Sequence, residues 1–145
     1  MADQLAGQPM RTSTQLMLLI HAFVALRAKL VRAFTQIHPT VQDWHLFSDC
    51  PETGNLIVDG VLWTFHKPGS GLTFRSPSGV TLDLHRALPD PRVFDVWRLL
   101  QYVASVQSPS ETPPTESELQ AQLEELARAG YVVRMDPGGG FRLRG

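Results

Sequence analysis

The sequence predicts an α+β protein in which helices cover one face of an antiparallel sheet. Apolar residues recur first at helical steps of three and four, then at every second residue, and then again at helical steps. The segments between the period-two stretches are too short for parallel crossovers, so those strands should form an antiparallel meander. We expect the element order α-β-β-β-β-α-α-β-β.

The first helix should begin at Thr12, because Thr12 and Gln15 form a T-x-x-Q capping box. The basic residues Arg11, Arg27, Lys29 and Arg32 are interpreted as a solvated basic flank of this helix. The side chains predicted to form its buried stripe are Leu16, Leu19, Phe23, Leu26, Leu30, Phe34 and Ile37.

The period-two region should contain four strands, read as NLIVD, VLWTFHK, GLTFR and VTLDLHR. Turn signals separate them at Gly60, at PGSG and at SPSG. The PGSG turn joins two strands, whereas a phosphate loop has a longer frame that opens a helix. We therefore interpret PGSG as a hairpin turn.

Two helices and a β-hairpin are expected to follow. Asp90 and Pro91 predict the start of the second helix, with a capping oxygen followed by a fixed φ. Thr115 and Glu118 form a capping box for the third helix, and Gly130 stands where a left-handed cap belongs. The last two strands are YVVRM and FRLR, joined by DPGGG. The buried stripe expected for the second helix is Val93, Val96, Trp97, Leu100, Val103 and Ala104.

These elements predict four segments. Residues 1–11 form a flexible arm, and residues 12–106 form the α+β core. Residues 107–114 are a proline-rich connector, and residues 115–145 form a helix plus β-hairpin packed on or beside the core.

The composition narrows the classes of partner and compartment. A formal net charge of −1 gives no electrostatic reason to expect nucleic acid or an anionic membrane. Cys50 is the only cysteine, so no intramolecular disulfide forms, which suits a reducing cytosol. The apolar run Leu16–Leu26 has about half the length that spans a bilayer. We expect a cytoplasmic protein.

Strand alternation places seven polar side chains on one face of the meander: Thr64, His66, Thr73, Arg75, Thr81, Asp83 and His85. Two imidazoles can act as general acid and base, and a cation can stabilise a developing anion. The aspartate could orient a histidine tautomer. Metal-independent nucleases and transferases need such a set of imidazole, cationic and carboxylate side chains. Alternatively, any half-buried antiparallel sheet shows water an alternating polar face, and this explanation accounts for most of the pattern.

No metal or cofactor is expected. His38, His45 and Cys50 match no standard zinc spacing. His21 lies within an apolar run and is interpreted as a packed or hydrogen-bonded helix residue. The chain contains no G-x-S-x-G, H-E-x-x-H or G-x-G-x-x-G motif.

The C-terminal segment, ESELQAQLEELARAGYVVRMDPGGGFRLRG, resembles the recognition helix and wing of winged-helix proteins. The charges of the helix count against DNA binding, because Arg128 is its only basic residue. Its acidic residues, which repel phosphate, are Glu116, Glu118, Glu124 and Glu125. Arg134, Arg142 and Arg144 on the hairpin keep the alternative open.

The overall layout resembles small bacterial domains of unknown function, including those encoded beside polymorphic toxins as immunity proteins. The stretches TFHKPGSGLTF and VTLDLHRALPDPRVFDVWRLLQYV and the terminal hairpin carry this resemblance. It implies an α+β fold and a protein partner, and it assigns no functional residues.

Three hypotheses about function follow. The leading one is a non-enzymatic, immunity-like protein-binding domain. The second is a metal-independent nuclease or transferase that works through the sheet face, and the third is winged-helix binding of nucleic acid. The partner-binding candidates are Thr64, Thr73, Thr81, Glu118 and Glu125, and the catalytic candidates are His66, Arg75, Asp83 and His85.

Overall fold

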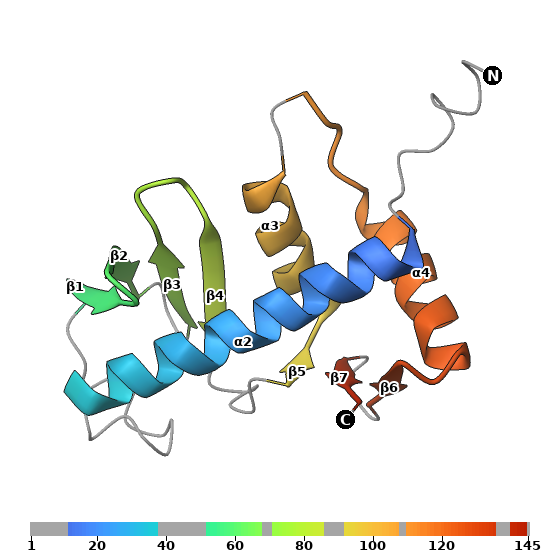
Figure 1. Cartoon of the computed structure of the whole chain (residues 1–145), viewed down its shortest axis with the longest axis horizontal. Coiled ribbons are helices and arrows are strands. Elements are labelled where there is room, and N and C mark those ends of the chain that lie inside the picture. Colours follow the sequence, from blue (N-terminus) through green and yellow to red (C-terminus); the bar gives the residue numbers. More distant parts are fainter. Residues whose placement is uncertain are drawn as a thin grey trace. The chain divides into compact units, whose positions relative to one another are not determined.

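The computed structural model describes residues 12–37, 52–67, 71–85, 92–107, 110–135 and 140–144, and only the backbone of Leu84 and His85. The chain divides into two compact units. The first, which we call the meander unit, is residues 24–91. The second, the split unit, combines residues 1–23 with residues 92–145. The helix α2 (Ser13–Ile37) contributes its first part to the split unit and its second part to the meander unit (Figure 1).

The meander unit contains a four-stranded antiparallel sheet with the strand order β1-β2-β3-β4. Its strands are β1 (Thr53–Val58), β2 (Val61–His66), β3 (Gly71–Arg75) and β4 (Thr81–His85). Each strand pairs with the next along the chain, as Figure 1 shows in green. The predicted meander is therefore confirmed.

A tight turn sets the register of the first hairpin. Asp59 and Gly60 both have positive φ, 51° and 79°, as a type I′ turn requires. The Asp59 carboxylate also accepts a hydrogen bond from the Lys29 ammonium on α2, at 2.8 Å. The turn thus pairs Val58 with Val61 and aligns the strands behind it.

One aromatic cluster forms the core between α2 and this sheet. The Phe34 ring on α2 meets the rings of Phe65 and Phe74 edge-on, with centroids 5.1 and 5.9 Å apart. Trp63 and Leu82 are buried on the same side of the sheet. The buried strand residues alternate with those of the predicted polar face, so their burial agrees with that face assignment.

Arg27 corrects the interpretation of a solvated basic flank. Its side chain is only 1% exposed, whereas Lys29 and Arg32 are exposed. The buried positions of α2 include Phe23 and Leu30, and Arg27 falls at the helical spacing between them. Periodicity therefore outweighs residue type at this position.

The split unit holds the other short elements. They are β5 (Val93–Phe94), α3 (Val96–Val106), α4 (Glu116–Arg128), β6 (Val132–Arg134) and β7 (Phe141–Leu143). The three strands form an antiparallel sheet with the order β5-β7-β6. Phe94 is the centre of the core, where its ring meets Phe23 edge-on at 6.1 Å and stacks on Phe141 at 6.3 Å.

The predicted start of the second helix was wrong, because a strand precedes the helix. Val93 and Phe94 pair with Arg142 and Phe141 as β5. The helix α3 begins only at Val96, where the Asp95 carboxylate accepts a hydrogen bond from the Arg98 backbone N–H at 2.8 Å. The buried residues of α3 are Val96, Leu99, Tyr102 and Val103, whereas Trp97, predicted to be buried, is 52% exposed.

The overall fold class is the predicted α+β class: a long N-terminal helix, an antiparallel meander, two helices and C-terminal strands in a second small sheet. Within the described residues, no helix combines the length and the apolar character that crossing a bilayer requires. The arm at residues 1–11 and the Asp90–Pro91 pair lie outside the described residues. The predicted division at the connector stays a prediction.

Candidate functional site

The register of the meander brings the predicted sheet-face residues together. Six of them form two rows across β2, β3 and β4: Thr64–Arg75–Thr81 and His66–Thr73–Asp83. The backbone of His85 pairs with Gly71, one step further along the sheet. We call the side carrying these rows the meander face.

The meander face is open rather than enclosed. The side chains of Thr64, His66 and Arg75 are exposed, and those of Thr81 and Asp83 are half-buried. The hydroxyls of Thr64 and Thr81 donate to the backbone oxygens of Arg75 and Gly79, at 3.3 and 3.4 Å. These two hydroxyls therefore form local contacts within the sheet.

The two histidines of the meander face lie on opposite sides of β3. His66 and His85 are separated by two strand spacings, about 9.6 Å, and by two residues along the strand, about 6.8 Å, so their Cα atoms lie about 12 Å apart. A general acid or base must come within hydrogen-bond reach of the proton that it transfers. A substrate bridging both histidines would have to lie across β3.

Arg75 is the central cation of the meander face. Its register partners are Thr64 and Thr81, which makes both His66 and Asp83 its diagonal neighbours. Diagonal neighbours in an antiparallel sheet are about 7–8 Å apart, within reach of a long side chain. A cation between an imidazole and a carboxylate can bind an anionic or hydrogen-bond-accepting group.

An apolar pair continues the same face at the β1–β2 hairpin. Ile57 pairs directly with Leu62, and the two side chains are 68% and 48% exposed. Neither residue of this pair is among the predicted site residues. The alternation of side chains along NLIVD could have indicated it, because Ile57 stands between the buried Leu56 and Val58 and must therefore point to the opposite side.

The two glutamates proposed to meet a partner have structural contacts in the split unit. Glu118 accepts a hydrogen bond from the Thr115 backbone N–H at 2.8 Å and completes the predicted capping box. Glu125 lies 3.5 Å from Arg128, one helical turn away. A partner-binding role for these two residues stays a prediction.

No cluster of three or more potential metal ligands exists among the described residues. His38, His45 and Cys50 lie outside them. The pKa of the Tyr102 phenol is raised by burial, but Tyr102 belongs to the core of the split unit, where its ring centroid lies 5.2 Å from that of Phe23. It is not part of the meander face.

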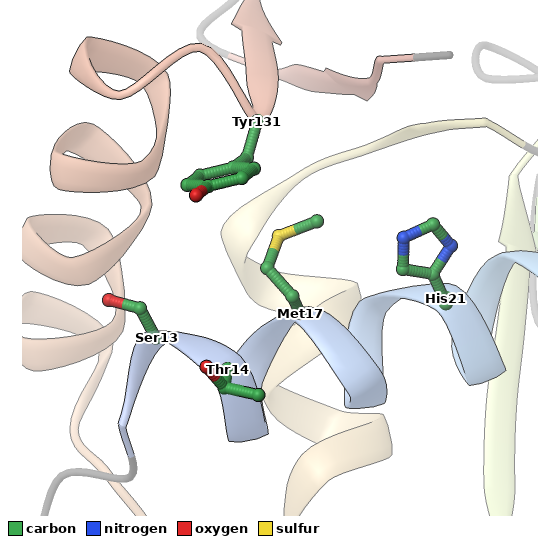
Figure 2. A pocket seen from close by; sticks show the side chains of 5 residues that line it. All are labelled: Ser13, Thr14, Met17, His21 and Tyr131. Atoms are coloured by element: carbon green, nitrogen blue, oxygen red, sulfur yellow. The ribbon is translucent and has the colours of Figure 1, made fainter.

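A pocket of about 300 Å³ lies in the split unit. The described residues that line it are Ser13, Thr14, Met17, His21 and Tyr131 (Figure 2). His21 is exposed on α2, so the part of its interpretation that made it a packed residue was wrong, and the hydrogen-bonded alternative stays a prediction. Sequence patterns did not indicate this pocket, because Tyr131 is far from the helix residues along the chain.

The comparison with protein families decides the classification, because one family model matches residues 16–142, nearly the whole of both units. The chain belongs to the DUF6896 family. This family is described as a domain of unknown function. No curated protein and no solved structure matches the chain significantly. The expectation of a domain of unknown function is therefore confirmed, and the family assigns no site.

Proposed function

We propose that this DUF6896 chain is a non-enzymatic protein-binding domain and that the meander face is its docking surface. The observation that carries the proposal is the open face, on which the exposed Ile57–Leu62 pair lies two residues along β2 from the Thr64–Arg75 row and His66 lies two residues beyond that row. Small-molecule sites are usually concave and bury most of their ligand. An open face with apolar and polar parts suits the surface of another protein better.

The make-up of the face indicates what kind of partner it fits. Single exposed apolar side chains are normal, but Ile57 and Leu62 are register partners and form one continuous patch. Protein interfaces combine an apolar centre with a polar rim. We therefore expect a partner with an apolar side chain for the pair and with carboxylates or carbonyls for Arg75.

An immunity role is the more specific form of this proposal, with a protein toxin as the partner. The support is the resemblance in layout and a well-capped scaffold that carries an open binding face. We place the binding in the cytoplasm, as the single cysteine suggests.

The nuclease or transferase alternative has less support. It needs His66 and His85 to act on one substrate, and their Cα atoms lie about 12 Å apart across β3. Arg75 and Asp83, as diagonal neighbours on the meander face, remain suited to binding a partner.

Winged-helix binding of nucleic acid is favoured by one observation. The described elements of the split unit follow the order helix, strand, helix, helix, strand, strand, with β7 between β5 and β6. Within this order, α4, β6 and β7 are the helix and hairpin that resemble the recognition helix and wing of winged-helix proteins. The charges oppose nucleic acid, because α4 begins with two glutamates and the Arg134 guanidinium pairs with Glu124 at 2.5 Å. We therefore rank this function below protein binding.

The test of protein binding uses a partner recovered from the source cells at stoichiometric amounts. The variant Ile57→Lys/Leu62→Lys should weaken its binding at least tenfold, measured by calorimetry with the purified partner, because it places two charges in the apolar centre. Val133→Lys is the matched control, since Val133 is a 40% exposed strand residue of the other sheet. For a toxin partner, protection of growth should follow the same pattern.

Two outcomes would contradict the proposal. One is undiminished binding by the double variant while it remains folded. The other is a failure to recover any stoichiometric partner, even after cross-linking in the cells.

A further inference from the structure

The pocket in the split unit has a defined layout of polar and apolar groups. Ser13, Met17 and His21 follow one another at four-residue steps and so share one face of α2. Figure 2 shows the Met17 side chain extending toward the Tyr131 ring, with Ser13 and Thr14 on one side of Met17 and His21 on the other. Ser13 and His21 are about 12 Å apart along the helix axis. The pocket is thus apolar in the middle and polar at both ends.

Tyr131 is held in place by the end of α4. The Gly130 N–H donates to the Ala127 oxygen at 3.1 Å, and the Tyr131 N–H donates to the Leu126 oxygen at 3.0 Å. These two bonds form a Schellman cap, for which Gly130 has the required left-handed φ of 89°. The backbone carbonyl oxygen of Tyr131 also accepts a hydrogen bond from the Arg144 backbone N–H at 3.3 Å. The backbone on both sides of the ring is therefore fixed before any ligand arrives.

Tyr131 is 54% exposed, whereas the neighbouring Val132 is buried in the core of the unit. An exposed aromatic ring on a fixed backbone loses little conformational entropy when it binds a ligand. A phenol face and a thioether together form favourable walls for another aromatic ring.

We propose that this pocket binds a small planar aromatic compound, with its ring between Met17 and Tyr131 and with hydrogen-bonding groups toward Ser13 and His21. The volume of about 300 Å³ suits a ligand of one or two fused rings, at the small end of ligand pockets. The described lining offers hydroxyl groups and an imidazole, which can donate or accept hydrogen bonds, and it contains no carboxylate that could pair with a cation. The ligand class that we assign to these described residues is therefore neutral or anionic. This site is separate from the meander face and does not depend on the function proposed for it.

The test uses three probes that share one ring system: 2-naphthoate, 2-naphthol and 2-naphthylmethylammonium. Binding is followed by the NMR signal of the Met17 methyl group in protein labelled at its methionine methyls, assigned through Met17→Leu. Naphthoate and naphthol should shift this signal in a saturable way, because the ring current of the bound ring acts on the methyl. The cationic probe should bind at least tenfold more weakly.

Two variants identify the site. Tyr131→Leu should weaken naphthoate binding at least tenfold, and Tyr131→Phe should retain most of the binding because it keeps the ring. Trp97→Leu is the matched control, since Trp97 is a similarly exposed aromatic residue, at 52%, on α3. Circular dichroism checks that each variant is folded.

The proposal is overturned by any of three results: no saturable shift with naphthoate or naphthol, binding that Tyr131→Leu leaves unchanged, or a loss of binding in Trp97→Leu equal to that in Tyr131→Leu. Equal binding of the cationic probe would overturn the assigned ligand class.

Discussion

The two units differ in how they use their polar side chains. In the split unit, Asp95 and Thr115 cap the helices α3 and α4, and Glu124 pairs with Arg134. In the meander unit, His66 and Arg75 lie on an exposed sheet face. Polar groups that satisfy helix ends contribute to stability, whereas exposed groups on a sheet contribute little and remain available for contacts. The difference indicates that binding by the meander unit would not compete with its folding.

Arg27 is the exception within the meander unit, and its replacement should have the largest effect. Arg27→Ala should lower the free energy of unfolding by about 3 kcal/mol. The substitution leaves a cavity where a large side chain was buried, and it breaks the interactions of a buried charged group. Arg32→Ala, on the exposed side of the same helix, should cost less than about 0.5 kcal/mol. Urea unfolding of both variants measures the difference.

Arg27→Met separates the two causes of this loss. It keeps much of the volume and removes the charge, so a loss smaller than that of Arg27→Ala would assign part of the cost to the cavity. If Arg27→Ala and Arg32→Ala cost the same, the side chain of Arg27 would not be buried in solution.

A pair of threonine variants tests the comparison between the units directly. Thr115→Ala should cost about 1 kcal/mol, because Thr115 Oγ1 accepts from the Glu118 N–H at 3.1 Å at the start of α4. Thr64→Ala on the meander face should cost less than about 0.5 kcal/mol. Denaturant midpoints at constant slope give both values. The reverse order would refute the difference that we draw between the units.

The smallest effect should appear at alkaline pH and involve Tyr102. Burial raises the pKa of its phenol in the folded state. Below the ordinary value of about 10 the phenol is neutral in both states, so its contribution to stability is constant. As the pH rises above that value, the unfolded state loses the proton first, and stability falls until the folded phenol also ionises. Tyr102→Phe should lose less stability as the pH rises through this range. If its stability depends on pH as steeply as that of the unsubstituted protein, the Tyr102 phenol is not the cause of the loss.

The meander was predictable because local information determines it. Alternation separates the buried Trp63, Phe65 and Phe74 from the polar residues between them, and Gly60 marked the first hairpin turn, although Asp59 was read as part of the strand. The same alternation brought His66, Arg75 and Asp83 to one face. Their catalytic and binding roles stay predictions, because a face assignment contains no information about a ligand.

The split unit was harder to predict because its contacts join distant parts of the sequence. The strand β5 has only two residues, Val93 and Phe94, and its partner β7 lies near residue 141. No local pattern distinguishes so short a strand from the first turn of a helix. The pocket was missed for the same reason, since His21 and Tyr131 meet only after folding.

The position of β7 between β5 and β6 has a consequence for the order of folding. Residues 24–91 are continuous, so the meander unit can form while the rest of the chain is still being synthesised. The split unit needs Phe23, Phe94 and Phe141 at once, and its central strand is the last of its elements along the chain. The contacts of the split unit therefore join residues that are far apart in the sequence, and we expect this unit to fold slowly. Nascent chains that end before residue 141 should leave the Phe23 and Phe94 rings exposed, as a surface for chaperones to bind.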